Sequence, residues 1–206
     1  MIEIAEEIRA IGRRVGRVAA ESGETVSVTL ERTCDAAVED VWDAITDPER
    51  LRRWFLPVSG DLREGGTFQT EGNAGGEILV CDAPKLLRVT WGGETSVVEL
   101  RLSPLGDEQT ALELQHTVPI EIAQSGAGAL YVGPGWDLTL FALGRYAVGV
   151  VADDPLAAGG SPEGIELARQ SVLAWKATVE ESGTATADEV NAGVEVAMAQ
   201  FAPGTA

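Results

Sequence analysis

The sequence is poor in cysteine, histidine and positive charge. It holds two cysteines, Cys34 and Cys81, and one histidine, His116. These are too few for a disulfide framework or a Cys/His zinc site, so we expect no metal and no cofactor. Each cysteine lies in or beside an apolar run, which favours a buried structural thiol. The 15 basic residues stand against 33 acidic ones, giving a formal charge of −18. This charge makes nucleic acids and anionic membrane surfaces poor partners.

Long hydrophobic runs are also missing from the sequence. No apolar stretch approaches the ~18 residues needed to span a bilayer, and the N-terminus shows no apolar core followed by a cleavage site. We therefore expect no membrane association and a cytoplasmic, reducing location. The chain has 206 residues, of which 45% are hydrophobic. This is enough for a sizeable core in one ordinary domain with extensions.

The N-terminal third predicts a helix, a strand and two short helices. Apolar residues recur every three or four positions over residues 2–19, which predicts an amphipathic helix and an N-terminal segment of residues 1–24. Alternation over residues 25–32 predicts a half-buried strand. Asp35 is a candidate cap for the next helix. The pair Asp47-Pro48 ends that helix and starts another, because Asp accepts hydrogen bonds from free N–H groups and Pro fits a first turn.

The rest of the chain changes period twice. Between residues 57 and 118, about six short strands alternate with glycine turns, which is typical of an antiparallel meander. Gly133-Pro134-Gly135 is predicted to open a long helix that ends a domain of residues 25–151. Residues 152–206 form a helical extension, in which Ser161 and the pair Thr186 and Glu189 are helix caps. One sheet has to bury one face, and the long helix is the element large enough to cover it.

Several short motifs, taken in this order, resemble the SRPBCC superfamily, also called START-like or Bet v 1-like. Within it, the sequence is similar to the branch of homologues of the activator of heat-shock protein 90 ATPase. The residues that carry the resemblance are Val41-Trp42, Thr46-Asp47-Pro48, Leu51 and Trp54, Gly65-Gly66-Thr67-Phe68, Pro84-Lys85-Leu86, Thr90-Trp91, Val97–Leu102, Thr110–Leu114, His116 and Gly135-Trp136. They span roughly residues 25–150.

The resemblance implies an α+β helix-grip fold. In this fold a curved antiparallel sheet wraps around a long C-terminal helix, and here an extra N-terminal helix and two extra C-terminal helices would be added. It also implies a deep, mostly apolar cavity. Members of the superfamily include lipid and steroid carriers, polyketide aromatases and cyclases, and co-chaperone domains. A fold shared by so many activities does not fix the function.

The candidate site is mostly aromatic. His116 shares its strand parity with Leu112 and Leu114, so we expect it to face the core, with its pKa lowered by burial. It can be structural, orient a ligand, or act as an acid/base. Aromatic walls with few polar groups are typical of small-molecule pockets. The candidate ligand-binding residues are Trp42, Trp54, Phe55, Phe68, Trp91, His116, Tyr131, Trp136 and Phe141.

The sequence favours binding of a small hydrophobic ligand, lipid-, polyketide- or aromatic-like, in a cavity between the sheet and the long helix. One alternative is an enzyme of the polyketide cyclase, aromatase or dehydratase type, with His116 as a weak catalytic candidate. Another is an interaction module that modulates a chaperone ATPase. The C-terminal helices could form a buttress, a lid or a homodimer contact. The sequence leaves open which ligand binds and whether any reaction occurs.

Overall fold

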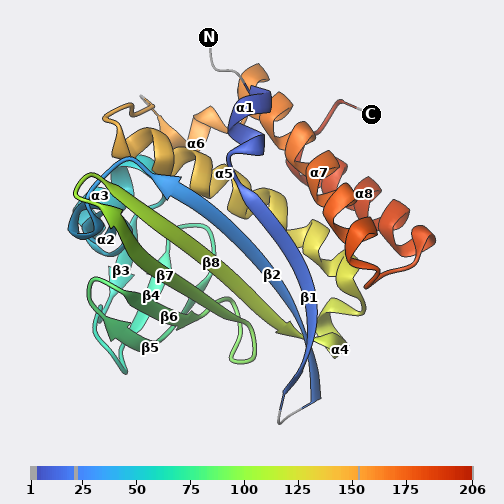
Figure 1. Cartoon of the computed structure of the whole chain (residues 1–206), viewed down its shortest axis with the longest axis horizontal. Coiled ribbons are helices and arrows are strands. Elements are labelled where there is room, and N and C mark those ends of the chain that lie inside the picture. The colour runs from blue at the N-terminus through green and yellow to red at the C-terminus, as the bar shows by residue number, and fades with distance from the viewer. Residues whose placement is uncertain (1–3, 21–22, 153, 206) are drawn as a thin grey trace. The chain divides into compact units, whose positions relative to one another are not determined.

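A computed structural model describes residues 4–20, 23–152 and 154–205 (Figure 1). The chain forms two compact units. The first unit comprises Met1–Leu30, Thr117–Leu140 and Ala157–Ala206, and the second comprises Glu31–His116 and Phe141–Leu156. Residues 1–3, 21 and 22 of the predicted N-terminal segment, of which residues 2 and 3 belong to its predicted helix, lie outside the described part of the chain.

The strands form one antiparallel sheet in the order β1-β2-β8-β7-β6-β5-β4-β3. The strands are β1 (Gly12–Ala20), β2 (Gly23–Cys34), β3 (Val58–Gly60), β4 (Thr67–Thr70), β5 (Gly75–Asp82), β6 (Leu86–Thr90), β7 (Val97–Gly106) and β8 (Gln109–Pro119). The helices are α1 (Ile4–Arg9), α2 (Val38–Thr46), α3 (Pro48–Trp54), α4 (Ile120–Ala123), the 3-10 turn η1 (Gly126–Gly128), α5 (Ala129–Ala147), α6 (Pro155–Ala158), α7 (Pro162–Ser182) and α8 (Ala187–Phe201). The predicted α+β class, with a long helix and added helices near both ends, is confirmed.

Local sequence signals place the two short helices of the second unit. The side chain of Asp47 accepts a hydrogen bond from the backbone N–H of Glu49, and Pro48 occupies the first turn of α3. Both features were predicted, because an N-cap side chain satisfies a free N–H group and proline needs none. Asp35 does not cap α2, which begins after Ala37 with no side-chain cap. It is two residues too early, and it accepts instead from Nε2 of Gln109 at 2.9 Å.

The prediction of one helix over residues 2–19 is wrong for most of its length. Helix α1 ends at Arg9, and residues 12–20 form strand β1 beside β2. Gly12 and Gly16 are poor helix formers. Pairing with β2 satisfies the backbone of this segment and overrides a helical apolar spacing. The spacing of the apolar residues in β1 therefore fits both a helix and a strand, and pairing with β2 selects the strand.

Two C-terminal helices pack together in the first unit, where α7 also contacts α1 and β1; Figure 1 shows α7 and α8 side by side. Ser161 caps α7, and Thr186 with Glu189 forms the predicted capping box of α8. Trp175 of α7 is fully buried. These contacts favour a buttress, and the lid and the homodimer contact stay predictions.

Helix α5 begins four residues before the predicted glycine-proline-glycine start, at Ala129. Gly133-Pro134-Gly135 therefore lies inside the helix. A Cβ atom at Gly133 would overlap the indole ring of Trp175. Gly133 is therefore not a turn residue, and its missing side chain allows α7 to approach α5 closely.

A buried ionic network joins three elements of the first unit. Oδ2 of Asp137 on α5 lies 2.9 Å from Nη2 of Arg13 on β1. The same carboxylate accepts hydrogen bonds from the hydroxyl of Ser171 and, at 3.0 Å, from Nε1 of Trp175 on α7. Burial raises the pKa of Asp137, while the Arg13 charge and the hydrogen bonds oppose that rise. A buried carboxylate is tolerated here because it is paired and multiply hydrogen-bonded.

The two cysteines differ in burial. Cys34 is buried as expected, but Cys81 is exposed. The prediction that Cys81 is buried was wrong. It relied on the apolar run of β5, whose last two residues, Cys81 and Asp82, are exposed. No disulfide joins the two residues, and both are free thiols.

Candidate functional site

The core face of the sheet in the second unit is defined by paired apolar residues. Ile78 on β5 pairs with Val89 on β6, and Val89 pairs with Val98 on β7. All three are buried. Directly paired residues of antiparallel strands share a face, and side chains alternate along a strand. Every second residue along these strands, and its direct partners, therefore lies on this core face.

Phe68 lies on this core face with glycine on both sides. It pairs with Gly60 on β3 and with Gly76 on β5, and Gly76 is two residues from Ile78. Neither partner has a side chain to cover the phenyl ring at those positions. The ring contacts Trp91 instead, with centroids 5.8 Å apart and planes inclined by 33°. The two aromatic residues predicted from the sequence are thus brought together.

A polar pair lies on the same face. Trp91 is two residues beyond Val89, and its backbone N–H donates to the backbone carbonyl oxygen of Ser96 at 2.8 Å. Ser96 is two residues before Val98, so its side chain also leaves the sheet on the core face. Oγ of Ser96 lies 2.8 Å from Nε2 of His116 on β8. We call Phe68, Trp91, Ser96 and His116 the core-face row.

His116 is neutral at physiological pH. Its side chain is 3% exposed, and burial lowers its pKa from 6.5 to about 4. Burial does so because a charged imidazolium is poorly solvated inside a protein. The predicted core orientation and the direction of the pKa shift are both confirmed. A neutral imidazole offers one donor and one acceptor, and Ser96 occupies one of the two nitrogens.

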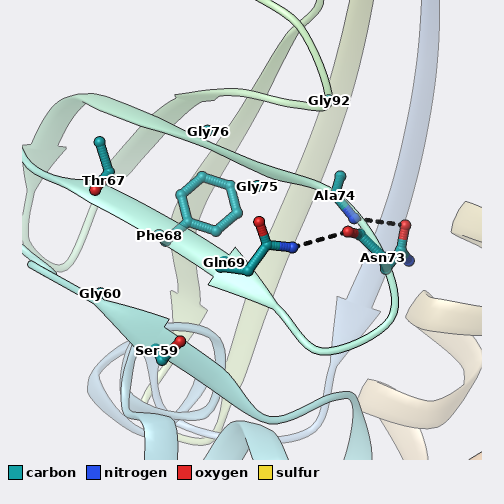
Figure 2. Close-up of a pocket in the computed structure, with 10 residues that line it drawn as sticks. All are labelled: Ser59, Gly60, Thr67, Phe68, Gln69, Asn73, Ala74, Gly75, Gly76 and Gly92. Carbon is teal, nitrogen blue, oxygen red and sulfur yellow. Dashed lines mark hydrogen bonds between the residues drawn. The ribbon is translucent and has the colours of Figure 1, made fainter.

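A hollow of about 650 Å3 lies at this end of the sheet (Figure 2). Ser59, Gln69 and Gly75 border it and are paired with one another across β3, β4 and β5. By strand alternation, the side chains of Ser59 and Gln69 leave the sheet on the face opposite to that of Phe68. The lining residues are Ser59, Gly60, Thr67, Phe68, Gln69, Asn73, Ala74, Gly75, Gly76 and Gly92. They belong to strands and turns, and the cavity predicted between sheet and long helix stays a prediction.

A second aromatic group contains Trp54, Phe55 and Tyr146. The Trp54 ring stacks on Tyr146 at a centroid distance of 6.3 Å and lies 5.5 Å from the Phe55 ring. Nε1 of Trp54 donates to the carbonyl of Ala44 at 2.9 Å, which ties α3 to α2. Trp54 is buried and Phe55 half-buried. This divergence of the two neighbouring rings matches the helical spacing.

The remaining candidate residues do not join either group. Trp42 is buried on α2, and Phe141 is half-buried with the Arg145 guanidinium 5.7 Å from its ring centroid. In the first unit, Trp136 is buried and Tyr131 is 44% exposed. The nine predicted residues therefore separate into the core-face row, the Trp54 group and four residues outside both groups.

Sequence reasoning missed Ser96 and Tyr146. Ser96 has the parity of Val98 and Leu100, so extending the alternation to the residue just before β7 would have placed it on the core face. Tyr146 follows Leu143 by three positions on α5, which is the helical spacing of one face. The glycine partners of Phe68 had no sequence signal, because a register between strands cannot be read from composition.

Among the described residues, no group of three or more His, Cys, Asp or Glu side chains is arranged to hold a metal ion. Across residues 4–20, 23–152 and 154–205, no helix is long and apolar enough to cross a membrane.

Strand order, long helix and added helices define an α+β protein of the helix-grip class. The family model described as Activator of Hsp90 ATPase homolog 1-like protein matches residues 35–147. The chain belongs to this family, a branch of the SRPBCC superfamily, as its motifs predicted.

Solved structures agree with this assignment. The chain is similar to CalU16 from Micromonospora echinospora, with 41% sequence identity and a TM-score of 0.68 over 82% of this chain and 98% of that one. DynU16, a protein in the dynemicin biosynthetic locus, is 24% identical, with a TM-score of 0.51 over 58% of this chain and 46% of that one. PFC0360w, an HSP90 activator from Plasmodium falciparum, is 20% identical, with a TM-score of 0.51 over 61% of this chain and 97% of that one. The last two likenesses show the fold alone. The comparison with curated proteins gives no match.

Proposed function

We propose that the protein binds a small hydrophobic molecule, lipid-, polyketide- or aromatic-like, against the core face of its sheet. The observation that carries this proposal is the position of Phe68 between two glycines. Cross-strand neighbours normally cover an aromatic ring in a sheet. Here the uncovered positions beside Phe68 would receive a ligand, and Trp91 would add a second aromatic contact.

The polar end of the core-face row supports the same proposal. Ser96 and the neutral His116 supply hydrogen-bonding groups without charge on an otherwise apolar face. A few polar groups on an apolar wall fix the orientation of a ligand without favouring an ionic one. A fold shared with a protein of the dynemicin biosynthetic locus is compatible with a natural-product ligand.

Native mass spectrometry of freshly purified protein tests the proposal, followed by denaturing extraction of any bound species. We expect a discrete small mass that Phe68→Ala reduces and that Tyr131→Ala retains. Tyr131 is the matched control because it is an exposed aromatic residue in the other unit. If neither extraction nor titration with hydrophobic aromatic probes detects binding, the proposal is wrong. The same spectrum gives the number of subunits, which tests the homodimer.

An enzyme is the second candidate, because Ser96 and His116 lie within hydrogen-bonding distance. Such an enzyme would act as a cyclase, aromatase or dehydratase, with His116 as acid/base. The lowered pKa of His116 argues against this role, since a general base works best with a pKa near the working pH. His116→Ala would then abolish turnover of a polyketide-like substrate while leaving its binding intact.

A chaperone-modulating module is the third candidate, and the description of the family model favours it. Addition of this protein to a heat-shock protein 90 chaperone would then change the ATPase rate. That effect would survive Phe68→Ala, whereas a ligand-dependent effect would not.

A further inference from the structure

We propose that the hollow bordered by Gln69 is a binding site for a neutral saccharide. The polar side chains of Ser59, Thr67 and Gln69 leave the sheet on the face opposite to the ring of Phe68, because neighbouring residues of one strand point to opposite faces. Phe68, Gly60 and Gly76 also line the hollow, and the inference rests on the polar groups, which the hydrophobic site proposed above does not use. The volume of about 650 Å3 falls within the range of small-molecule sites, about 300–1,000 Å3.

The floor of the hollow is bare main chain. Gly60, Gly75, Gly76 and Gly92 are four of its ten lining residues. Gly60 has a φ of +133°, and a Cβ atom there would collide with the carbonyl oxygen of Thr67. At Gly76 a Cβ atom would collide with the carbonyl oxygen of Thr90. The strands approach too closely for a side chain at these two positions, which share the face of Phe68. On the face of Gln69 the paired residue is Gly75, so the flat face of a pyranose ring can lie on open main chain there.

Two amides at the rim are already fixed in orientation. Nε2 of Gln69 donates to the carbonyls of Thr70 at 2.8 Å and of Asn73 at 2.9 Å. Oδ1 of Asn73 accepts from the N–H of Ala74 at 2.8 Å; Figure 2 draws this bond and the one from Gln69 to Asn73. Oε1 of Gln69 is thereby left as an acceptor and Nδ2 of Asn73 as a donor. Such pre-organised groups lose little entropy on binding.

Two hydroxyl groups complete the rim. Ser59 and Thr67 are exposed and line the hollow. Within the part of the chain that the structure describes, neither hydroxyl has a hydrogen-bond partner. Each hydroxyl both donates and accepts, as every sugar hydroxyl does. The rim therefore matches a ligand with several adjacent hydroxyl groups.

Charge decides against an anionic ligand. None of the described residues that line the hollow is charged, and the whole chain carries a formal charge of −18. A phosphate or carboxylate would meet no counter-charge there and would be repelled at longer range. A neutral sugar requires no counter-charge.

Titration of the full chain, followed by nitrogen–proton correlation NMR, tests the site. The probes are methyl glucoside, methyl galactoside, maltose and the anion methyl glucuronide, which keeps the pyranose ring. We expect saturable shifts of the backbone amide signals of Gly75, Gly76 and Gly92 with at least one neutral sugar. We expect methyl glucuronide to bind at least about tenfold more weakly, a factor equal to about 1.4 kcal/mol.

Two variants assign the shifts to the rim. Thr67→Val and Ser59→Ala each remove one exposed hydroxyl with little change of shape, and each is expected to weaken sugar binding about fivefold. Ser103→Ala is the matched control, because it removes an exposed hydroxyl of β7 that does not line the hollow, and it should leave sugar binding unchanged. The hydrophobic site is tested separately by extraction from Phe68→Ala, so the two proposals fail separately.

Three results would overturn the saccharide site. They are the absence of saturable shifts with all three neutral sugars, equally tight binding of methyl glucuronide, and unchanged affinity in both hydroxyl variants. Shifts that spread over the chain and fail to saturate count with the first result, because they report non-specific contact.

Discussion

Ser96 and His116 form a buried hydrogen-bonded pair, with Oγ and Nε2 2.8 Å apart. Ser96 immediately precedes β7 and His116 lies near the end of β8, so this contact depends on the correct register between the two strands. His116 is neutral because burial lowers its pKa, and its protonation would place an unsolvated charge on the core face.

Stability should therefore depend on pH through His116. Its pKa is 6.5 when unfolded and about 4 when folded. Between these values the unfolded chain binds a proton that the folded chain does not. The free energy of unfolding is therefore not reduced by His116 above the pKa of the unfolded state. It falls as the pH falls from that pKa towards the folded pKa, by about 3 kcal/mol in total. Urea unfolding of the wild type and of His116→Gln, at about pH 7 and about pH 4.5, measures the difference. A variant with the same loss of stability on acidification would contradict this assignment.

The Arg13–Asp137 network predicts a large effect of breaking one partner. Asp137→Asn leaves the guanidinium of Arg13 buried without its counter-charge, and we expect the free energy of unfolding to fall by about 3 kcal/mol. The double variant Arg13→Met with Asp137→Leu removes both charges. Its loss of unfolding free energy should be markedly smaller than the sum of the losses of Arg13→Met alone and Asp137→Leu alone. Urea unfolding measures all of them. Additive losses would mean that the two residues contribute independently.

Close packing at Gly133 predicts a steric effect. Gly133→Ala inserts a methyl group into the indole of Trp175, so we expect a loss of about 1–3 kcal/mol. Gly159→Ala is the matched control, because a Cβ atom there meets no heavy atom within 4 Å. Thermal unfolding compares the two. Equal melting temperatures would show that α7 can move away from α5 at little cost.

The two thiols should react at very different rates. Cys81 is exposed, whereas Cys34 is buried and burial raises its pKa. The thiolate is the reactive form, so the native protein should react rapidly with one equivalent of a thiol reagent. The second equivalent should require denaturant. Cys81→Ser should abolish the rapid phase, and persistence of that phase would place the reactive thiol at Cys34.

The sequence predicted the features that repeat along the chain or depend on near neighbours. The strands from β2 to β8, the cap at Asp47 and the capping box at Thr186 follow from alternation and local hydrogen bonding. Residues 12–20 could not be assigned in this way. Their spacing suits a helix, and only the presence of β2 makes a strand the better choice.

The candidate site was predicted in part for the same reason. His116, Phe68 and Trp91 were selected by residue type and parity. Their association with Ser96, and the glycine partners of Phe68, depend on the register between strands. The hollow beside Gln69 follows from absent side chains on neighbouring strands, which no single segment of sequence reveals.

The order of strands also has a consequence for synthesis. Strand β2 lies next to β8 in the sheet, although β3 to β7 separate them along the chain. As the chain leaves the ribosome, β2 has no partner on that edge until Pro119 has emerged. Pairings between distant segments form slowly and expose strand edges meanwhile. The nascent chain therefore passes through a stage in which an apolar strand is open to aggregation, and a slower rate of translation would lengthen it.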